Sequence, residues 1–336
     1  MLYAGLDIHK NFSQAVVCRE NGNVLKEGRV PTTKESISEF FSEFKEELKI
    51  AIEAGINSEY IFDFLEEQGH KVTLAHPLKT RMIAESRVKT DKIDANILAY
   101  LLRTNLLPTS YMPPKDIREI RQLVRQRIFL GRFSAKLKNR IHAELIRKGI
   151  RYERKGIIFT SDGKNWLHSL NIPFMESYLI MLGSIEDQIK KHNKKINQRG
   201  RKYEEVKLLT SIPGIGVYSA LVIFSEIGNI ERFNTEEKLF SYSGLIPSVN
   251  QSGNHRYYGR ITKQGSKNLR WILTENVRVH LNWARANDVE TKLLKYYLRL
   301  CKKGKPKNKA VIATARKLLQ VIYWMLKNKT EYCVKG

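Results

Sequence analysis

Cysteine is scarce in this chain of 336 residues, which contains only three. Cys18, Cys301 and Cys333 lie far apart in the sequence, so they form neither a disulfide framework nor the closely spaced ligand set of a zinc site. Because disulfides persist mainly in oxidising compartments, this usage fits a reducing cytoplasm. We therefore expect a cytoplasmic protein.

Long hydrophobic runs are also lacking. No apolar stretch approaches the ~20 residues that a membrane-spanning helix needs. The first ten residues include Asp7 and show no signal-peptide pattern. We therefore expect no membrane partner.

Acidic residues are outnumbered by basic ones. The chain has 34 Asp and Glu against 59 Lys and Arg, which gives a net charge of +25 and an isoelectric point near 9.9. This balance favours a polyanionic partner, with nucleic acid ahead of an anionic membrane surface. The length is enough for about two domains with cores of their own.

Residues 1–110 alternate between short apolar runs and amphipathic segments. The patterns predict strands at 2–6, 12–18, 24–30, 48–52 and 72–75, and helices at 36–44, at 59–67 and from Pro77 onward. The first three strands suit an antiparallel meander, whereas the later ones need crossover helices. We therefore expect an α/β domain with a mixed sheet.

Four acidic side chains occur where such a sheet brings them together. Asp7 ends the first strand and Glu53 the fourth, so they share an edge if these strands are parallel neighbours. Asp91 and Asp94 are about 60° apart on a helix that can close over this edge. Each acid alone is more often a cap, a turn residue or a solvated side chain. Together they predict a site for hard divalent cations, with two Mg²⁺ as the expected metal.

Residues 111–207 are expected to form a basic helical arm. Helical periodicity runs from Asp116 to about Lys148, and residues 118–155 contain 13 basic against 3 acidic side chains. Leucines seven residues apart on one face resemble a coiled-coil seam. The opposite face is expected to contact a phosphate backbone, with a merely solvated face as the alternative. Its nucleic-acid-binding candidates are Arg118, Arg121, Arg125, Arg132, Lys136 and Arg140.

The rest of the arm is expected to return along the first helix. Residues 147–164 have poor periodicity and are interpreted as a loop. A second basic helix is expected from Ile172 to about Lys207, antiparallel to the first. A helical pair of this length can also dimerise, which the sequence does not decide.

Pro213, Gly214, Ile215 and Gly216 separate two apolar helical patterns, which is the signature of a helix-hairpin-helix motif. Backbone N–H groups at Gly214 and Gly216 can hold a phosphate at the helix N-terminus. The alternative is a tight turn between packed helices.

Residues 242–270 are rich in glycine, serine and cations, with Tyr257 and Tyr258 among them. Cations can hold a phosphodiester and aromatic rings can stack on bases. A serine there could attack phosphorus if its proton is removed, although a serine in a glycine-rich loop is more often a turn residue. The nucleic-acid-binding candidates of this block are Arg256, Arg260, Lys263, Lys267 and Arg270.

Two parts of the chain resemble one known family. Residues 1–110 resemble the RuvC-like (ribonuclease H-like) domain of DEDD transposases, which are related to the Piv DNA invertases and use a bridge RNA to guide recombination. The C-terminal block is similar to the transposase domain of the same family. The matching segments are Gly5-Leu6-Asp7-Ile8-His9-Lys10, Ile52-Glu53-Ala54, Lys89-Thr90-Asp91-Lys92-Ile93-Asp94-Ala95, Gly244-Leu245-Ile246-Pro247, Ser252-Gly253, Gly259-Arg260-Ile261-Thr262-Lys263-Gln264-Gly265 and Leu269-Arg270.

The resemblance implies a fold of class α/β plus α in three parts. These are a RuvC-like mixed sheet (1–110), a coiled-coil-like basic arm (111–207) and a mainly helical transposase domain with a helix-hairpin-helix (208–336). It also implies Mg²⁺ bound by the four acids and Ser252 as the nucleophile that forms a covalent serine–DNA phosphoester, with Ser248 as the alternative serine.

The implied partners are donor and target DNA, a non-coding guide RNA and further copies of the chain in a dimer or tetramer. The acids and the serine lie in different domains, so the site is expected to be composite, assembled between protomers in a prokaryotic cytoplasm at the nucleoid. The residues themselves lead only as far as polyanion binding and a carboxylate metal site.

Two other classes of function stay open at the level of sequence. One is a RuvC-type, structure-selective endonuclease in which the acids activate water and Ser252 is structural. The other is a non-catalytic nucleic-acid-binding protein with a degenerate site. A covalent protein–DNA adduct separates the recombinase from the endonuclease, and insensitivity to Asp91→Asn and Asp94→Asn would indicate the binding protein.

Overall fold

The computed structural model describes residues 1–83, 91–152, 157–252 and 255–334. The chain divides into two compact units, Met1–Met112 and Pro113–Gly336. The division into three parts at 110 and 207 stays a prediction.

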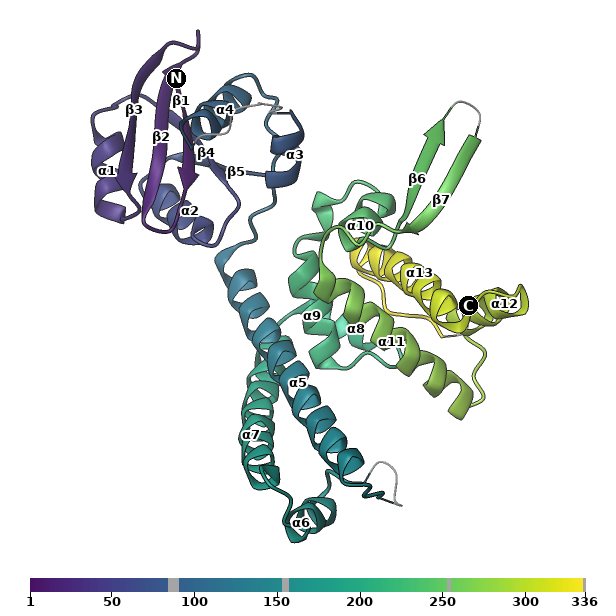
Figure 1. Ribbon diagram of the computed structural model, residues 1–336. Coiled ribbons are helices and arrows are strands. Elements are labelled where there is room, and N and C mark those ends of the chain that lie inside the picture. The colour runs from purple at the N-terminus through teal and green to yellow at the C-terminus, as the bar shows by residue number, and fades with distance from the viewer. Residues whose placement is uncertain (84–90, 153–156, 253–254, 335–336) are drawn as a thin grey trace. The chain divides into compact units, whose positions relative to one another are not determined.

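The first unit contains a five-stranded mixed sheet in the order β3-β2-β1-β4-β5 (Figure 1). β1 pairs antiparallel with β2 and parallel with β4, while β3 extends the antiparallel side and β5 the parallel side. The expected mixed sheet is thereby confirmed. The strands are β1 (Leu2–Ile8), β2 (Phe12–Arg19), β3 (Val24–Pro31), β4 (Leu48–Glu53) and β5 (Lys71–Ala75).

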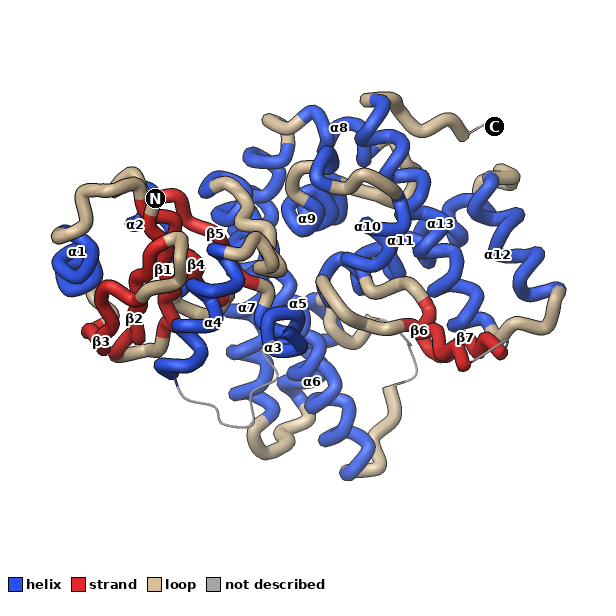
Figure 2. The backbone as a smooth tube through the Cα atoms, turned by 90° about the horizontal axis from the view of Figure 1, so that it is seen from above, coloured by secondary structure: helices blue, strands red, loops and turns tan. Residues whose placement is uncertain are grey.

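Helices cover both faces of this sheet, with α1 (Lys34–Ser42) and α4 (Asp91–Arg103) on opposite sides (Figure 2). Residues of β1 alternate between the two faces. Leu2, Ala4 and Leu6 join the core formed with α1 and α2 (Ser58–Glu67), whereas Tyr3 joins the core under α4. Asp7 has the same parity as Tyr3, so it lies on the α4 face.

The helical region expected from Pro77 onward contains two described helices, α3 (Pro77–Ile83) and α4. Lys89 and Thr90 of the motif that ends at Ala95 lie outside the described residues. Asp91 and Asp94 both fall in the first turn of α4, where acidic side chains complement the positive end of the helix dipole.

The second unit is mainly helical and is built around α9 (Val217–Ile227), whose residues from Ala220 to Ile227 are all buried. A helix that is apolar on every side belongs inside a core. The helices are α5 (Lys115–Arg147), α6 (Ser161–Ser169), α7 (Met175–Gly200), α8 (Glu204–Thr210), α9, α10 (Glu236–Ser243), α11 (Lys267–Ala286), α12 (Lys292–Lys302) and α13 (Lys307–Asn328), with a short 3₁₀ turn at Ile230–Arg232.

The expected antiparallel return of the arm is present: α5 and α7 lie side by side, joined through α6 (Figure 1). Two boundaries differ from the sequence interpretation. Part of the expected loop is helix α6, which Thr160 caps through its side chain. The second long helix ends at Gly200 instead of continuing to Lys207, because the backbone becomes extended at Tyr203 before a separate helix, α8, begins at Glu204.

Part of the glycine- and serine-rich block, expected to be a loop, forms an antiparallel hairpin of β6 (Pro247–Ser252) and β7 (His255–Ile261), which extends away from the helices of its unit (Figure 1). Across the described ranges, every helix is too short or too polar to traverse a lipid bilayer.

Candidate active site

The glycine at position 5 lets α4 reach the strand that carries Asp7. A Cβ at Gly5 would collide with the backbone oxygen of Ala95 and lie 2.7 Å from the amide nitrogen of Ala99. Only a residue without a side chain permits this close approach. It brings the first turn of α4 beside the end of β1, so the sequence motifs around Gly5 and Ala95 serve one packing contact.

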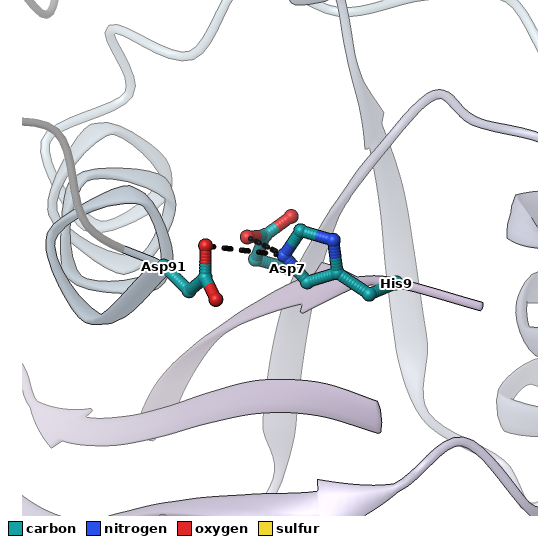
Figure 3. Close-up of side chains that lie close together, drawn as sticks. All are labelled: Asp7, His9 and Asp91. Atoms are coloured by element: carbon teal, nitrogen blue, oxygen red, sulfur yellow. Dashed lines mark ion pairs between the residues drawn. The ribbon is translucent and has the colours of Figure 1, made fainter. Parts of the chain in front are cut away.

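Asp7, His9 and Asp91 converge at this contact (Figure 3). His9 Nε2 lies 3.1 Å from Asp7 Oδ2 and 3.2 Å from Asp91 Oδ1. The Nε2 atom is itself buried, and among the described residues no acceptor meets it with hydrogen-bond geometry. The imidazole nitrogen therefore lies between the two carboxylates, close to both.

Burial raises the pKa of Asp7 above its usual value, and the nearby carboxylates of Asp94 and Asp91 raise it further. The nearby His9 side chain opposes them and lowers the pKa of Asp7. Asp94 is therefore close enough to act on Asp7, as its spacing from Asp91 predicted. Three acids repelling one another at one place is an arrangement that a bound cation would relieve.

Glu53 is the last residue of β4 and is half-buried. The parallel register pairs Leu6 with Ile52, so Asp7 and Glu53 leave adjacent strands at the same edge of the sheet. The expected neighbourhood of the two strands is confirmed. The metal-competent group formed by Asp7, His9 and Asp91 does not include Glu53, whose place in the metal site stays a prediction.

The donor set at this edge fits a divalent cation. One potential ligand atom each from Asp7, His9 and Asp91 lies within 4.8 Å of the other two. Carboxylate oxygens suit Mg²⁺ and Mn²⁺, and the imidazole nitrogen extends the range toward softer metals. Sequence reasoning included His9 in a motif but gave it no role. The sequence signal for a role of His9 at the metal site was its position two residues after Asp7.

The basic face of α5 is exposed along only part of its length. Arg118 is buried, and Arg121 donates through Nε and Nη2 to the carbonyl oxygen of Ser225 at 2.9 and 2.7 Å. At this end the face expected to contact a phosphate backbone packs against α9, so Arg118 and Arg121 have structural contacts instead of a free surface. Arg132, Lys136 and Arg140 are exposed, and their contact with nucleic acid stays a prediction.

Arg125 forms a paired contact with Glu226, a fully buried carboxylate near the end of α9. Nε and Nη2 of Arg125 donate to the two carboxylate oxygens at 2.8 and 3.0 Å. Ser266 and Asn268 donate to the same carboxylate at 2.9 and 3.3 Å. Sequence reasoning missed Glu226; a single acid in the apolar run of α9 was the signal for a buried ion pair.

The glycines of the predicted helix-hairpin-helix have different surroundings. Gly214 has φ +91°, and a Cβ there would lie 2.9 Å from the backbone nitrogen of His280, so this turn is packed against α11. Gly216 is exposed at the start of α9, with open space around it. Phosphate binding by Gly214 and Gly216 stays a prediction. The close packing against His280 by itself explains why position 214 is a glycine.

Ser252 is the last residue of β6, and its side chain lies outside the described part of the structure, as does that of Arg256 in β7. Ser248 is described: its Oγ occupies the space that a Cβ at Gly259 would need on the opposite strand. Ser248 therefore packs across the hairpin. The nucleophilic role of Ser252 stays a prediction, with Ser248 as the alternative.

Two glycines hold the base of the hairpin. A Cβ at Gly244 would collide with the backbone of Gln264, and one at Gly265 with the backbone of Tyr242. Arg270 donates to the carbonyl oxygen of Ser243 at 2.8 Å, so this nucleic-acid-binding candidate also has a structural contact. Arg260, Lys263 and Lys267 are exposed around this base.

A shallow hollow of about 450 Å³ lies on the surface of α7. Three cations and three amides line it, without a carboxylate among the described lining residues. Amides and cations together suit phosphate and sugar oxygens. Sequence reasoning noted the cations but not the amides; the lining residues are Lys190, Asn193, Lys194, Asn197, Gln198 and Arg201.

Comparison with known proteins gives two family matches in chain order. Residues 4–148 match the family model of a DEDD transposase of IS110 type. Residues 206–292 match the transposase IS116/IS110/IS902 family. The first match contains the acidic cluster, and the second contains the hairpin and Glu226.

Several curated relatives align along most of their length. The pilin gene-inverting protein of Moraxella bovis is 30% identical over 274 residues, which cover 78% of this chain and 74% of that protein. The transposase for insertion sequence element IS1328 of Yersinia enterocolitica is 26% identical over 82% of this chain and 83% of its own length. The transposase for insertion sequence element IS1533 of Leptospira borgpetersenii is 25% identical, with 83% and 85% covered.

Proposed function

Since this chain belongs to the IS116/IS110/IS902 family of transposases and is a DNA transposase/recombinase, we propose that it cuts and rejoins DNA through a covalent link to Ser252. The observation that carries the proposal is the convergence of Asp7 and Asp91, from distant parts of the sequence, at one edge of the sheet. We interpret the first unit as a RuvC-like nuclease fold, which its mixed sheet supports.

In this proposal Asp7, Asp91 and Asp94, together with Glu53, would hold Mg²⁺ at the edge of the sheet, with His9 beside them. The bound metal would supply positive charge to the phosphodiester and its leaving oxygen. The carboxylates keep that charge at a fixed place, and a bound cation would oppose the burial and the neighbouring acids that raise the pKa of Asp7.

The serine conserves the energy of the DNA bond. As the Ser252 hydroxyl loses its proton and its oxygen bonds to phosphorus, one phosphorus–oxygen bond of the DNA breaks and a deoxyribose hydroxyl is released. The hydroxyl of the new strand then attacks the same phosphorus and frees the serine. Because one phosphoester replaces another at each step, rejoining needs no outside source of energy.

The proposed partners follow from the same assignment. Donor and target DNA, and a non-coding guide RNA that pairs with both, would contact the cationic surfaces of α5, α7 and the base of the hairpin. Copies of this chain would assemble into a homo-oligomer and form the composite site between them. The exposed positions of Arg132, Lys136 and Arg140 support contact with a phosphate backbone.

A recombination assay tests the proposal. The full chain is mixed with the transcript that flanks its gene, donor and target DNA, and either Mg²⁺ or a chelator. We expect joined product that depends on the metal and is lost in Ser252→Ala and Asp91→Asn, while Ser248→Ala is the matched serine control and remains active. Joined product made by Ser252→Ala would contradict the serine mechanism, and product made in the chelator would contradict the metal site.

A further inference from the structure

Two phenylalanines are exposed in the middle of the basic face of α5. Phe129 and Phe133 leave 58% and 39% of their surface accessible, although apolar surface gains about 25 cal/mol per Å² by leaving water. Their rings are nearly parallel, at 13°, with centroids 6.2 Å apart. Since they are one helical turn apart on one face, they present a continuous aromatic surface.

Cations accompany this aromatic pair along the helix. Arg132 also lies over the ring of Trp271 in α11, at 5.8 Å from its centroid, and Lys136 and Arg140 are exposed one and two turns further on. Between Ile120 and Ala143 the sequence contains seven Lys and Arg and no Asp or Glu. The surface is therefore both aromatic and strongly positive.

We propose that Phe129 and Phe133 form a stacking platform for unpaired bases of a nucleic-acid strand, whose phosphates contact Lys136 and Arg140. Stacking on aromatic rings tolerates any sequence, because every base has a π face. A duplex hides its base faces, so the platform takes a single strand or a loop. The inference rests on the proposed nucleic-acid partner, but on neither the role of Ser252 nor the metal.

A second copy of this chain is the main competing occupant of the platform. Two copies that met through this face of α5 would bring the row Arg132, Lys136 and Arg140 against its own equivalent. Like charges brought together in this way cost several kcal/mol. A nucleic-acid strand brings the opposite charge, so charge complementarity favours it.

Fluorescence anisotropy with the full chain tests the platform. The probes are a labelled, unstructured RNA strand of about 20 nucleotides, the same sequence as single-stranded DNA, and the corresponding DNA duplex. The double substitution Phe129→Leu and Phe133→Leu keeps apolar bulk but removes both rings. We expect roughly tenfold or greater weakening for a single strand and unchanged affinity for the duplex. The RNA and DNA probes show which kind of strand the platform prefers.

Salt dependence separates stacking from charge. The double Leu variant should bind more weakly with an unchanged slope of log affinity against log salt, whereas Lys136→Gln with Arg140→Gln should flatten the slope by about 0.7 per lost contact. Ile146→Ala, an exposed apolar change near the end of the same helix, is the matched control and should bind like the wild type.

Single-strand affinity in the double Leu variant equal to that of the wild type would overturn the inference. If that variant also loses a dimer that the wild type forms in sedimentation velocity, the face is an interface between copies instead. Both residues are exposed, so thermal unfolding of the variant should match the wild type and exclude misfolding as the cause.

Discussion

His280 illustrates at the residue scale how a buried side chain fixes its neighbours and its own protonation state. Its Nδ1 donates to the carbonyl oxygen of Pro213 at 2.8 Å, and its Nε2 accepts from the Thr291 hydroxyl at 2.9 Å. Thr291 Oγ1 in turn accepts from the amide of Leu294. These partners assign a neutral imidazole with its proton on Nδ1. Burial lowers the pKa of His280, against the bond to Pro213, which raises it.

The sign of the resulting pH dependence follows from linkage. A histidine whose pKa is lower in the folded state stabilises fully above its unfolded pKa of about 6.5 and progressively less as the pH falls through that value. The wild type should therefore exceed His280→Gln in free energy of unfolding by more at pH 7.5 than at pH 5.5.

Tryptophan fluorescence during urea unfolding measures this difference in the right place. All four tryptophans, Trp166, Trp271, Trp283 and Trp324, belong to the second unit, and the ring of Trp283 lies 6.0 Å from that of His280. His70, whose pKa burial also lowers, is in the first unit, so His70→Gln is the control. A gap between wild type and His280→Gln that stays constant or widens at low pH would contradict the assignment.

The acidic positions could be predicted at this scale because strand ends and helical spacing are local properties. Asp7 and Asp91 meet as the patterns indicated. His9 could not be given its role, because only the packing of α4 against Gly5 shows which side chain of the motif points between the two carboxylates.

Glu226 connects three elements of the second unit at the scale of secondary structure. Through its carboxylate it holds Arg125 of α5 and Ser266 at the start of α11, and its backbone oxygen accepts from the hydroxyl of Tyr242 in α10 at 2.9 Å. Burial raises the pKa of Glu226, but Arg125, Arg121 and Ser266 lower it by more. The carboxylate is therefore ionised at neutral pH and fixes the base from which the hairpin extends.

Replacing this carboxylate should loosen that base. We expect Glu226→Gln to lower the free energy of unfolding of the second unit by about 1.5–3 kcal/mol, below the ~3–5 kcal/mol of a fully buried pair, since Arg125 is 49% exposed. Glu290→Gln removes an exposed pair with Lys295 and should cost under about 1 kcal/mol. Equal losses in the two variants, measured by urea unfolding, would show that Glu226 is not a central contact.

Elements of the first unit were predictable because their strands are short apolar runs separated by polar turns. The helical arm was less predictable, because α6 is a helix of only nine residues in which just Gly163 and Leu167 are buried. The hairpin of β6 and β7 was not predicted, because the glycines of this block favour a loop. In the structure Gly259 leaves the space that the Ser248 side chain of the opposite strand occupies. Close approaches of this kind depend on distant residues and cannot be derived from local pattern.

At the scale of the whole molecule, the two units carry different parts of the proposed reaction. The acidic cluster belongs to the first, and Ser252, with most of the exposed cationic surfaces, to the second. The proposed reaction needs both groups at one phosphodiester. The basic side chains behind the net charge of +25 would contact phosphates of both the DNA and the guide RNA. The affinity for both nucleic acids should therefore fall steeply as the salt concentration rises.

Mass spectrometry of the protein after reaction with donor DNA, guide transcript and Mg²⁺ tests the central claim most directly. Trypsin releases residues 239–256 as one peptide that contains both Ser248 and Ser252, and fragmentation locates a nucleotide phosphate on either. The account predicts the adduct on Ser252, retained in Ser248→Ala and absent from Ser252→Ala and Asp94→Asn. Cleaved DNA with an unmodified peptide, equally abundant in Ser252→Ala, would contradict it and identify a hydrolytic nuclease.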